Sequence, residues 1–220
     1  MLNIARHAAW PLTIFLFAGL GSTYAQKYDI TPLVGATWGG TVRLEQLDLP
    51  NFDAHVANGL SYGLAAGFRF DGDDCDECNV VEFRWLRQRS HLGLKQDPLL
   101  DLPAAPFRPS FTIDRFLTDF TREWFYGEAK GVRPFVMGSL GAAMIATPLS
   151  TEPRFMFGIG TGVKFMTRRH WGMRLAVEYV PIVMHTQLQR VVCVNGCIVV
   201  LNGGIMNQFD VNVGPIFRFK

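Results

Sequence analysis

The stretch Gln208-Phe-Asp-Val-Asn-Val-Gly-Pro-Ile-Phe-Arg-Phe219 decides the fold, because it alternates between two kinds of residue. One face carries Phe209, Val211, Val213, Pro215, Phe217 and Phe219, and the other carries Asp210, Asn212, Gly214, Ile216 and Arg218. Successive side chains of a strand point to opposite faces. A final strand with an apolar face for lipid, a polar face for a lumen and a terminal aromatic is typical of a bacterial outer-membrane β-barrel.

The N-terminal residues indicate export. Arg6 and His7 precede an apolar run over residues 8–20, and Thr23-Tyr24-Ala25 then forms a small-residue cleavage pattern. The run is shorter than the roughly 20 residues that a membrane-spanning helix needs. We therefore expect residues 1–25 to be a cleaved signal peptide and residues 26–220 to be one barrel domain. No second apolar run of helix length follows, so a mature chain that crosses a membrane must do so as a closed barrel.

The composition agrees with a barrel in lipid. Hydrophobic residues make up 49% of the chain, with 18 Phe and 22 Gly, yet charged residues occur along its whole length. A barrel needs this mixture because each strand supplies a lipid face and a wet face. Removal of residues 1–25 takes away one basic residue, Arg6, and leaves 20 basic and 19 acidic residues. This balance gives no electrostatic footprint for nucleic acid.

Period-two alternation predicts eight antiparallel strands, and so an all-β, up-and-down transmembrane barrel. The expected strands are at about 29–43, 60–70, 80–90, 111–125, 132–146, 154–166, 173–185 and 208–219. The fourth strand has an ambiguous register, because Asp114, Phe116, Phe120, Arg122 and Trp124 share one parity. This mixture favours a bulge or a tilt.

The connections predict the orientation. Long links are expected at 44–58, 91–110 and 186–206, and short ones at 71–79, 126–131, 147–153 and 167–172. Outer-membrane barrels have short periplasmic turns and longer outer loops. We therefore expect a multi-pass outer-membrane protein with both termini in the periplasm.

Charged residues of the polar parity are expected in the lumen. They are Glu82, Arg84, Arg133, Lys164, Arg174, Glu178, Asp210 and Arg218. Side chains nearly fill the interior of an eight-stranded barrel, and buried charges must be paired. We predict a ladder of Glu/Arg pairs that plugs the bore, with Arg174 and Glu178 at its centre and with Gly158, Gly160 and Gly162 leaving space for arginines. The alternative is a narrow path for ions or small solutes lined by the same charges.

Several motifs resemble known families. The segment Asn212-x-Gly214-x-x-Phe217-x-Phe219 resembles the signal that outer-membrane barrels present to the barrel assembly machinery, although Lys220 follows it. Gly131-Val-Arg-Pro-Phe-Val-x-Gly138, the Gly158-x-Gly160-x-Gly162 repeat, and Trp171 to Glu178 resemble the OmpA-type superfamily of small porin-like barrels. The segment Cys193-Val-Asn-Gly-Cys197 resembles the outer loop of an uncharacterised group of envelope barrels. The resemblance spans roughly 131–219 and implies fold and location, without a reaction.

The four cysteines form two close pairs, Cys75 with Cys78 and Cys193 with Cys197. In an exported protein an even count favours disulfides. A shared zinc site is opposed by the expected topology, which places the pairs on opposite sides of an apolar band about 25 Å tall. The acidic turn 71–77 lacks a complete calcium-loop pattern, and its acids oppose a redox-active thiol. We expect two local disulfides, no metal and no cofactor.

Catalysis is not expected. The conceivable hydrolytic group is His185, Glu178 and Ser90, and the chain has no His-x-Ser-Asn segment like that of lipid A deacylases. Arg87, Arg89, Arg108 and Arg190 lie near the expected outer interface, where they are either a solvated rim or ligands for lipopolysaccharide phosphates.

Two functional hypotheses therefore remain, a structural or porin-like barrel whose outer loops bind a partner, and a narrow channel. A secreted lipocalin-like barrel, with its apolar face turned inward, is a third possibility. We expect a monomer whose partners are outer-membrane lipid, lipopolysaccharide and the assembly machinery.

Overall fold

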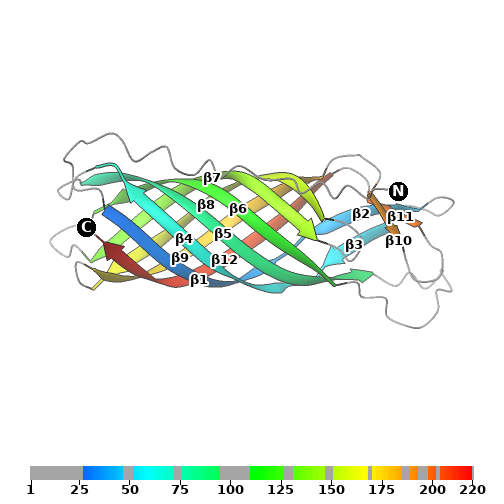
Figure 1. Ribbon diagram of the computed structural model, residues 1–220, viewed down its shortest axis with the longest axis horizontal. Coiled ribbons are helices and arrows are strands. Elements are labelled where there is room, and N and C mark those ends of the chain that lie inside the picture. The colour runs from blue at the N-terminus through cyan, green and yellow to red at the C-terminus, as the bar shows by residue number, and fades with distance from the viewer. Residues whose placement is uncertain are drawn as a thin grey trace, which may run out of the picture.

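The protein folds as a closed antiparallel β-barrel (Figure 1). The computed structural model describes residues 27–46, 52–71, 76–94, 110–125, 131–146, 151–167, 170–184, 189–192, 198–201 and 204–219. Within them the barrel wall consists of β1 (Lys27–Trp38), β4 (Gly59–Arg69), β5 (Glu77–Leu94), β6 (Ser110–Trp124), β7 (Val132–Ala146), β8 (Thr151–Met166), β9 (Trp171–Met184) and β12 (Gly204–Phe219). Neighbours in this order pair antiparallel, and β12 closes the ring on β1 from Tyr28 opposite Phe219 to Trp38 opposite Phe209. Across the described ranges, no helix is long and apolar enough to span a membrane.

The eight predicted strands are confirmed, but several of their ends differ: β5 ends at Leu94 and β12 begins at Gly204, each four residues beyond the predicted bounds. The largest difference is at the end of the first strand. The first strand was expected to continue to residue 43, but β1 ends at Trp38. Gly39 and Gly40 follow with φ of 85° and 112°. Positive φ is cheap only for glycine, so this pair turns the chain out of the barrel wall. The signal peptide, residues 1–25, lies outside the described residues.

Of the bulge or tilt expected in the fourth strand, the bulge is wrong. β6 pairs with β5 without interruption from Glu77 opposite Trp124 to His91 opposite Ser110. Arg115, Asp119 and Glu123 are completely buried on the inward parity of β6, while Asp114 and Arg122 face outward. These outward charges lie near the two ends of the strand. The inward and outward positions of β6 therefore alternate regularly, but the outward face carries both apolar and charged residues.

Four short strands extend one end of the barrel. They are β2 (Thr41–Gln46), β3 (Phe52–Val56), β10 (Gln189–Val192) and β11 (Ile198–Leu201), and they pair in the order β10, β11, β2, β3 before joining the end of β5 at Leu92–Leu94. We call the four short strands, together with the end of β5, the extension. Figure 1 shows it at the end of the barrel opposite the C-terminus. Apart from residues 41–43, which were expected in the first strand, its four short strands come from segments that were expected to be outer loops.

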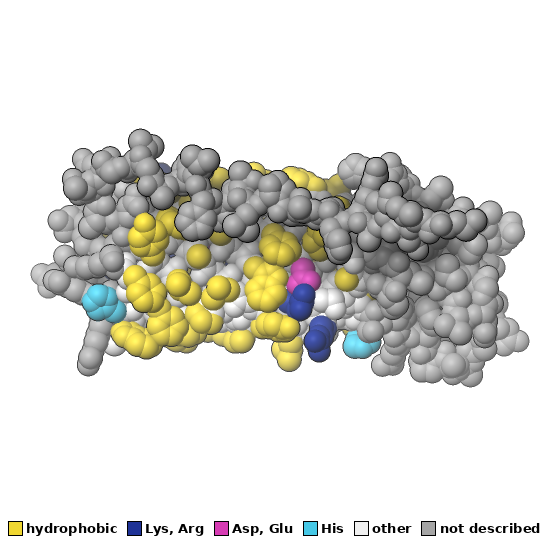
Figure 2. All heavy atoms as spheres, viewed as in Figure 1, with side chains coloured by type: hydrophobic (Ala, Val, Ile, Leu, Met, Phe, Trp, Pro, Cys, Tyr) yellow, Lys and Arg dark blue, Asp and Glu magenta, His cyan; other side chains and the backbone are white. Residues whose placement is uncertain are grey.

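The outward face of the barrel is apolar. Large hydrophobic side chains are exposed on all eight strands of the wall, among them Ile30, Leu64, Phe83, Phe116, Leu140, Ile159, Val177 and Phe209. Figure 2 shows hydrophobic side chains over much of the described surface on one face of the barrel. The buried inward parity carries charged and polar residues over much of its length. The lipocalin-like alternative, with the apolar face inward, is therefore wrong.

Candidate functional site

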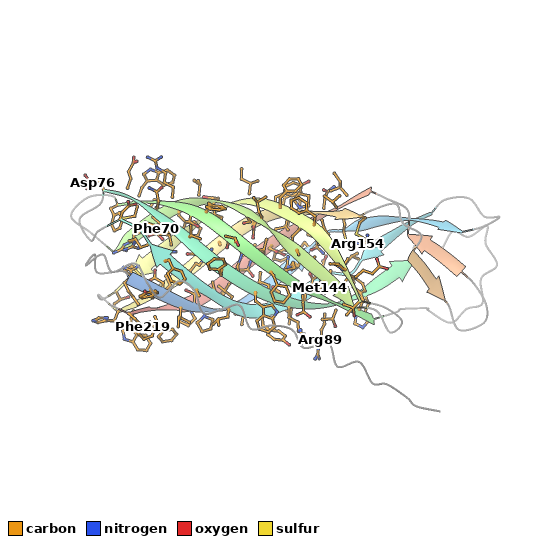
Figure 3. All side chains as sticks on the ribbon, turned by 45° about the horizontal axis from the view of Figure 1, so that its top comes forward. Phe70, Asp76, Arg89, Met144, Arg154 and Phe219 are labelled. Atoms are coloured by element: carbon orange, nitrogen blue, oxygen red, sulfur yellow. The ribbon has the colours of Figure 1, made fainter. Side chains whose placement is uncertain are left out.

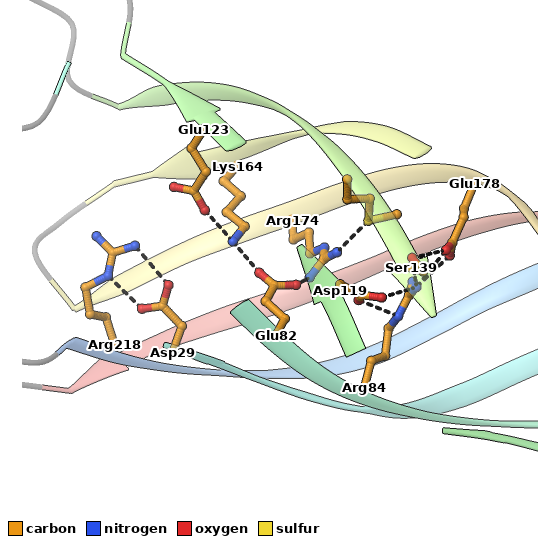
Figure 4. A network of polar contacts seen from close by, with 11 residues as sticks. Asp29, Glu82, Arg84, Asp119, Glu123, Ser139, Lys164, Arg174, Glu178 and Arg218 are labelled. Carbon is orange, nitrogen blue, oxygen red and sulfur yellow. Dashed lines mark hydrogen bonds and ion pairs between the residues drawn. The ribbon is translucent and has the colours of Figure 1, made fainter. Parts of the chain in front are cut away.

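The lumen holds a balanced set of buried charges. Eight ion pairs connect six acidic and six basic residues there, and none of these side chains is more than 7% exposed. The acids are Asp29, Glu82, Asp119, Glu123, Glu178 and Asp210, and the bases are Arg69, Arg84, Arg115, Lys164, Arg174 and Arg218. Cations and carboxylates alternate along the bore (Figure 4). We call these twelve residues the charge plug.

The largest connected part of the plug crosses between five strands. Glu123 on β6 accepts from Arg69 Nη2 at 3.0 Å and from Lys164 Nζ at 2.6 Å. Lys164 also bonds Glu82 at 2.6 Å, and Glu82 pairs in turn with Arg174. The Lys164 and Arg174 cations also lie over the Phe135 ring, 5.6 and 5.1 Å from its centre. Each carboxylate therefore satisfies two cations, which offsets part of the cost of burying all of them.

Arg84 is the centre of a second group. Its guanidinium lies 2.9 Å from Asp119 and 2.7 Å from Glu178. Ser139 Oγ donates to Glu178 at 2.6 Å. Arg84 and Asp119 are on the neighbouring strands β5 and β6, whereas the pair of Arg84 with Glu178 joins β5 to β9 across the bore. Ser139 is on β7.

Two further pairs lie toward the ends of this region. Arg115 on β6 pairs with Asp210 on β12 and lies 3.4 Å from Thr37 Oγ1. At the end that holds the C-terminus, Arg218 donates to both carboxylate oxygens of Asp29, at 2.7 and 3.1 Å. Bidentate pairs of this kind are the stronger and more directional ones.

Arg133 differs from the other predicted lumen residues. It has the inward parity of β7 but is only half-buried, and within the described part of the chain it forms no ion pair. Its guanidinium carbon lies 4.3 Å from the centre of the Phe125 ring. Arg133 is thus held by an aromatic face at the mouth of the bore.

Arg174 and Glu178, predicted at the centre of the ladder of pairs, both lie in the plug but do not pair with each other. Arg174 pairs with Glu82, and Glu178 pairs with Arg84. Four residues of one strand span about 13 Å, so these two side chains share a face without meeting. The partners come instead from strands across the bore.

The space beside the β8 glycines is also used differently from the prediction. A Cβ on Gly158 would lie 2.6 Å from Glu178 Oε1. A Cβ on Gly160 would lie 2.6 Å from Met137 Cε, and one on Gly162 would lie 2.4 Å from Phe135 Cζ. The glycines therefore accommodate a carboxylate, a methionine and a phenyl ring, and not arginines.

Sequence reasoning missed five members of the plug. They are Asp29, Arg69, Arg115, Asp119 and Glu123. Asp29 and Arg69 occupy the polar parity of strands that were recognised, so strict use of parity identifies them. Arg115, Asp119 and Glu123 were hidden because Asp114 and Arg122 put charges on the other parity of the same strand.

An apolar layer, also missed, lies in the lumen toward the extension, at a level that also holds the buried polar residues Arg115 and Gln88. It consists of Val56, Phe111, Ile113, Leu117, Ala143, Ile145, Met156, Val180, Ile182, Met184 and Met206, all at most 9% exposed. Most of these residues lie in the halves of β6, β7, β8, β9 and β12 next to the extension. The sign of this layer in the sequence is the stretch Val180-Pro-Ile-Val-Met184, which is apolar on both parities. Arg154, which pairs with Glu152, is buried on the inward parity of β8 in the same end of the barrel.

The other predicted site residues have separate places. Asn212 and Gly214 face inward on β12, and Phe217 and Phe219 face outward, with Phe217 4.7 Å from the Trp171 ring. Cys78 is buried in β5, and Cys75, Cys193 and Cys197 lie outside the described residues. Asp71, from the acidic turn, accepts from the backbone N–H of Asn79 at 2.6 Å. The predicted disulfides remain predictions.

The hydrolytic group is not assembled by the described residues. His185 lies outside them, and Ser90 Oγ donates to the carbonyl oxygen of Ala57 at 2.6 Å. Glu178 is occupied by Arg84 and Ser139. The arrangement of buried, mutually neutralising charges can hold strands together, and both Ser90 and Glu178 are engaged in hydrogen bonds.

Solved structures share this fold. OprG from Pseudomonas aeruginosa is similar with a TM-score of 0.56 at 9% identity, over 89% of this chain and 97% of that one. AlkL, solved in lipid bilayers, has a TM-score of 0.51 at 13% identity, over 93% and 96%. Neisserial surface protein A has a TM-score of 0.50 at 16% identity, over 88% and 97%. The chain has the fold of a small outer-membrane β-barrel. No protein-family model matches it, and no curated protein is similar enough in sequence to match.

Proposed function

We propose that this protein is a closed structural barrel of the bacterial outer membrane, which carries the extension on the cell surface as its interaction platform. The termini then lie in the periplasm, beside the short connections. This function includes no reaction. Its main support is the set of side chains that fill the bore.

The double closure of the lumen carries the proposal. An ion that crosses the bore must first pass side chains whose charges are already paired, and a stripe of one sign is absent from the described lumen. It must then pass the apolar layer, in which Met156, Val180 and Ile182 are completely buried. Apolar constrictions resist the entry of water and ions. Both features favour a plug over the narrow channel that remains the alternative.

The extension supports a role at the surface. The barrel wall continues into it through β5, and β2 and β3 follow the turn at Gly39 and Gly40. A binding segment held on a rigid wall loses less conformational entropy when a partner binds. The barrel then serves as the fixed base of a surface module.

Further proposals complete this account. The protein assembles as a monomer through the barrel assembly machinery, with Asn212, Gly214, Phe217 and Phe219 as the recognised segment. Cys75 with Cys78, and Cys193 with Cys197, form local disulfides that fit an exported protein. The resemblance to OmpA-type barrels and to the group with a Cys-x-Asn-Gly-Cys loop supports this assignment.

Thiol accessibility tests whether the bore is closed. Ser139→Cys places a thiol in the charge plug, and His91→Cys places one on the exposed outward face of β5. A water-soluble, positively charged thiol reagent should modify His91→Cys quickly and leave Ser139→Cys unmodified in refolded barrels. The unsubstituted protein sets the background from the native cysteines. Equal modification of the two variants would mean a hydrated path and would overturn the proposal.

A further inference from the structure

We propose that the outward face of β5 at the boundary next to the extension binds a phosphate group of an outer-leaflet glycolipid, with Arg89 as the receptor. This inference rests on the proposed location and orientation, and it adds a specific ligand to them. The residues that carry it are Arg87, Arg89, Trp85 and Tyr62 on the lipid side of the wall, together with Asp114.

Two outward ion pairs mark the two edges of the membrane. Glu77 pairs with Arg122 near the periplasmic end, and Arg87 pairs with Asp114 near the other end. Ten residues separate Glu77 from Arg87, and eight separate Asp114 from Arg122. With tilted strands this spacing is about 20 to 25 Å along the barrel axis, close to the height of an outer-membrane apolar band. Arg87 and Asp114 therefore lie at headgroup depth.

Aromatic residues complete the boundary. Trp85 and Tyr62 face outward with their ring centres 6.3 Å apart, and Trp85 Nε1 donates to Asp114 at 3.2 Å. Amphipathic aromatic rings prefer this depth. Figure 2 shows basic and acidic side chains gathered at the edge of the apolar band that is nearer the extension.

Asp114 neutralises Arg87 and leaves Arg89 without a counter-charge. Arg87 donates to both oxygens of Asp114, at 2.7 and 2.8 Å. Arg89 is exposed two residues further along the same face, about 7 Å higher. It makes no ion pair within the described residues, and its side chain points away from the wall (Figure 3). His91 is the next exposed residue on this face.

The chemistry of the guanidinium selects the ligand. An arginine offers a planar fork of donors that matches the oxygens of a phosphate. At this depth, beside lipid and above aromatic rings, the available phosphates are those of the lipid headgroups. In the leaflet that faces the extension these headgroups belong to phosphorylated glycolipid, which the proposed orientation predicts.

Binding of lipid A tests the site. The refolded protein would be titrated in detergent with lipid A, with dephosphorylated lipid A and with phosphatidylglycerol, and bound lipid would be counted by native mass spectrometry. We expect tighter binding of lipid A than of the other two. Arg89→Gln should weaken lipid A binding about tenfold, as expected when a charge-assisted hydrogen bond is lost.

Arg122→Gln is the matched control. Arg122 is also an outward, exposed arginine, but it is paired with Glu77 at the opposite edge. Its substitution should leave lipid A affinity within about twofold, and Asp114→Asn, which frees the charge of Arg87, should strengthen binding.

Equal losses of affinity for Arg89→Gln and Arg122→Gln, or no preference for phosphorylated over dephosphorylated lipid A, would overturn the site. Arg89-dependent binding of phosphatidylglycerol equal to that of lipid A would overturn the choice of glycolipid. A barrel that conducts ions yet binds lipid A through Arg89 would contradict the proposed function and leave this site standing.

Discussion

Arg84 and Arg133 show how differently two inward arginines of one barrel are held. Arg84 is completely buried between Asp119 and Glu178, whereas Arg133 rests on the Phe125 ring at the mouth. Removal of a buried cation leaves its carboxylates uncompensated, which is costlier than the loss of the attraction itself. Removal of the guanidinium at the mouth leaves no buried carboxylate uncompensated.

We expect Arg84→Met to lower the free energy of unfolding by about 3–5 kcal/mol, because two buried carboxylates lose their cation. Arg133→Met should cost about 1 kcal/mol or less, the size of a partly exposed cation–π contact. Urea unfolding of both variants in the same lipid vesicles, followed by tryptophan fluorescence, measures the difference. Similar losses for the two variants would show that ion pairing does not hold the bore together.

Gly158 and Gly138 make a second comparison at this scale. A Cβ at Gly158 would lie 2.6 Å from Glu178 Oε1, and a Cβ at Gly138, on the outward face of β7, would meet no atom within 4 Å. Gly158→Ala should cost about 1–3 kcal/mol through overpacking, while Gly138→Ala should be neutral or stabilise by up to about 1 kcal/mol, because glycine is unfavourable inside a strand. The same unfolding assay decides, and a neutral Gly158→Ala would mean that Glu178 moves freely.

The strand β12 both closes the ring and carries the proposed assembly signal. Phe217 contacts the Trp171 ring, whereas Phe219, 51% exposed, has no ring partner in the described chain. We expect Phe219→Ala to slow insertion by reconstituted assembly machinery and to change the unfolding free energy less than Phe217→Ala does. Wild-type insertion of Phe219→Ala would remove Phe219 from the signal.

The strands show what alternation can and cannot predict. The regular alternation of β4 and β12 predicted their faces, because lipid and lumen impose opposite chemistry on the two parities, although β12 begins at Gly204, four residues before the predicted bound. β6 was misjudged, because outward charges near the membrane edges follow the depth in the membrane and not the parity. The end of β1 was missed because the turn there depends on the positive φ of Gly39 and Gly40. The sequence shows only that two glycines are present, and glycine also occurs inside the strands.

The partners inside the lumen could not be predicted from the sequence. Parity places Glu82, Arg174, Arg84 and Glu178 inside, but the stagger between strands decides which of them meet across the bore. The alternation does not determine that stagger, so the sequence analysis could place Arg174 and Glu178 in the lumen but could not name their partners. The apolar layer escaped for a related reason, since residues such as Ile182 have no polar neighbour on the other face to reveal their direction.

Under the proposed function, the bore is closed and the barrel carries the extension as a surface module. The charge plug contains as many acids as bases, so it has no net charge that would attract ions of one sign. The apolar layer lies toward the extension and overlaps the plug at Arg115, which is opposite Ala143. We propose that the two layers together oppose conduction.

Single-channel conductance of refolded residues 26–220 in planar bilayers tests this central claim most directly. Folding is verified on the same sample by heat-modifiable electrophoretic mobility. The account predicts a silent bilayer that contains folded protein. Reproducible conductance steps that change in size or ion selectivity when Arg174 or Glu178 is replaced would contradict it, because they would place a conducting path through the charge plug.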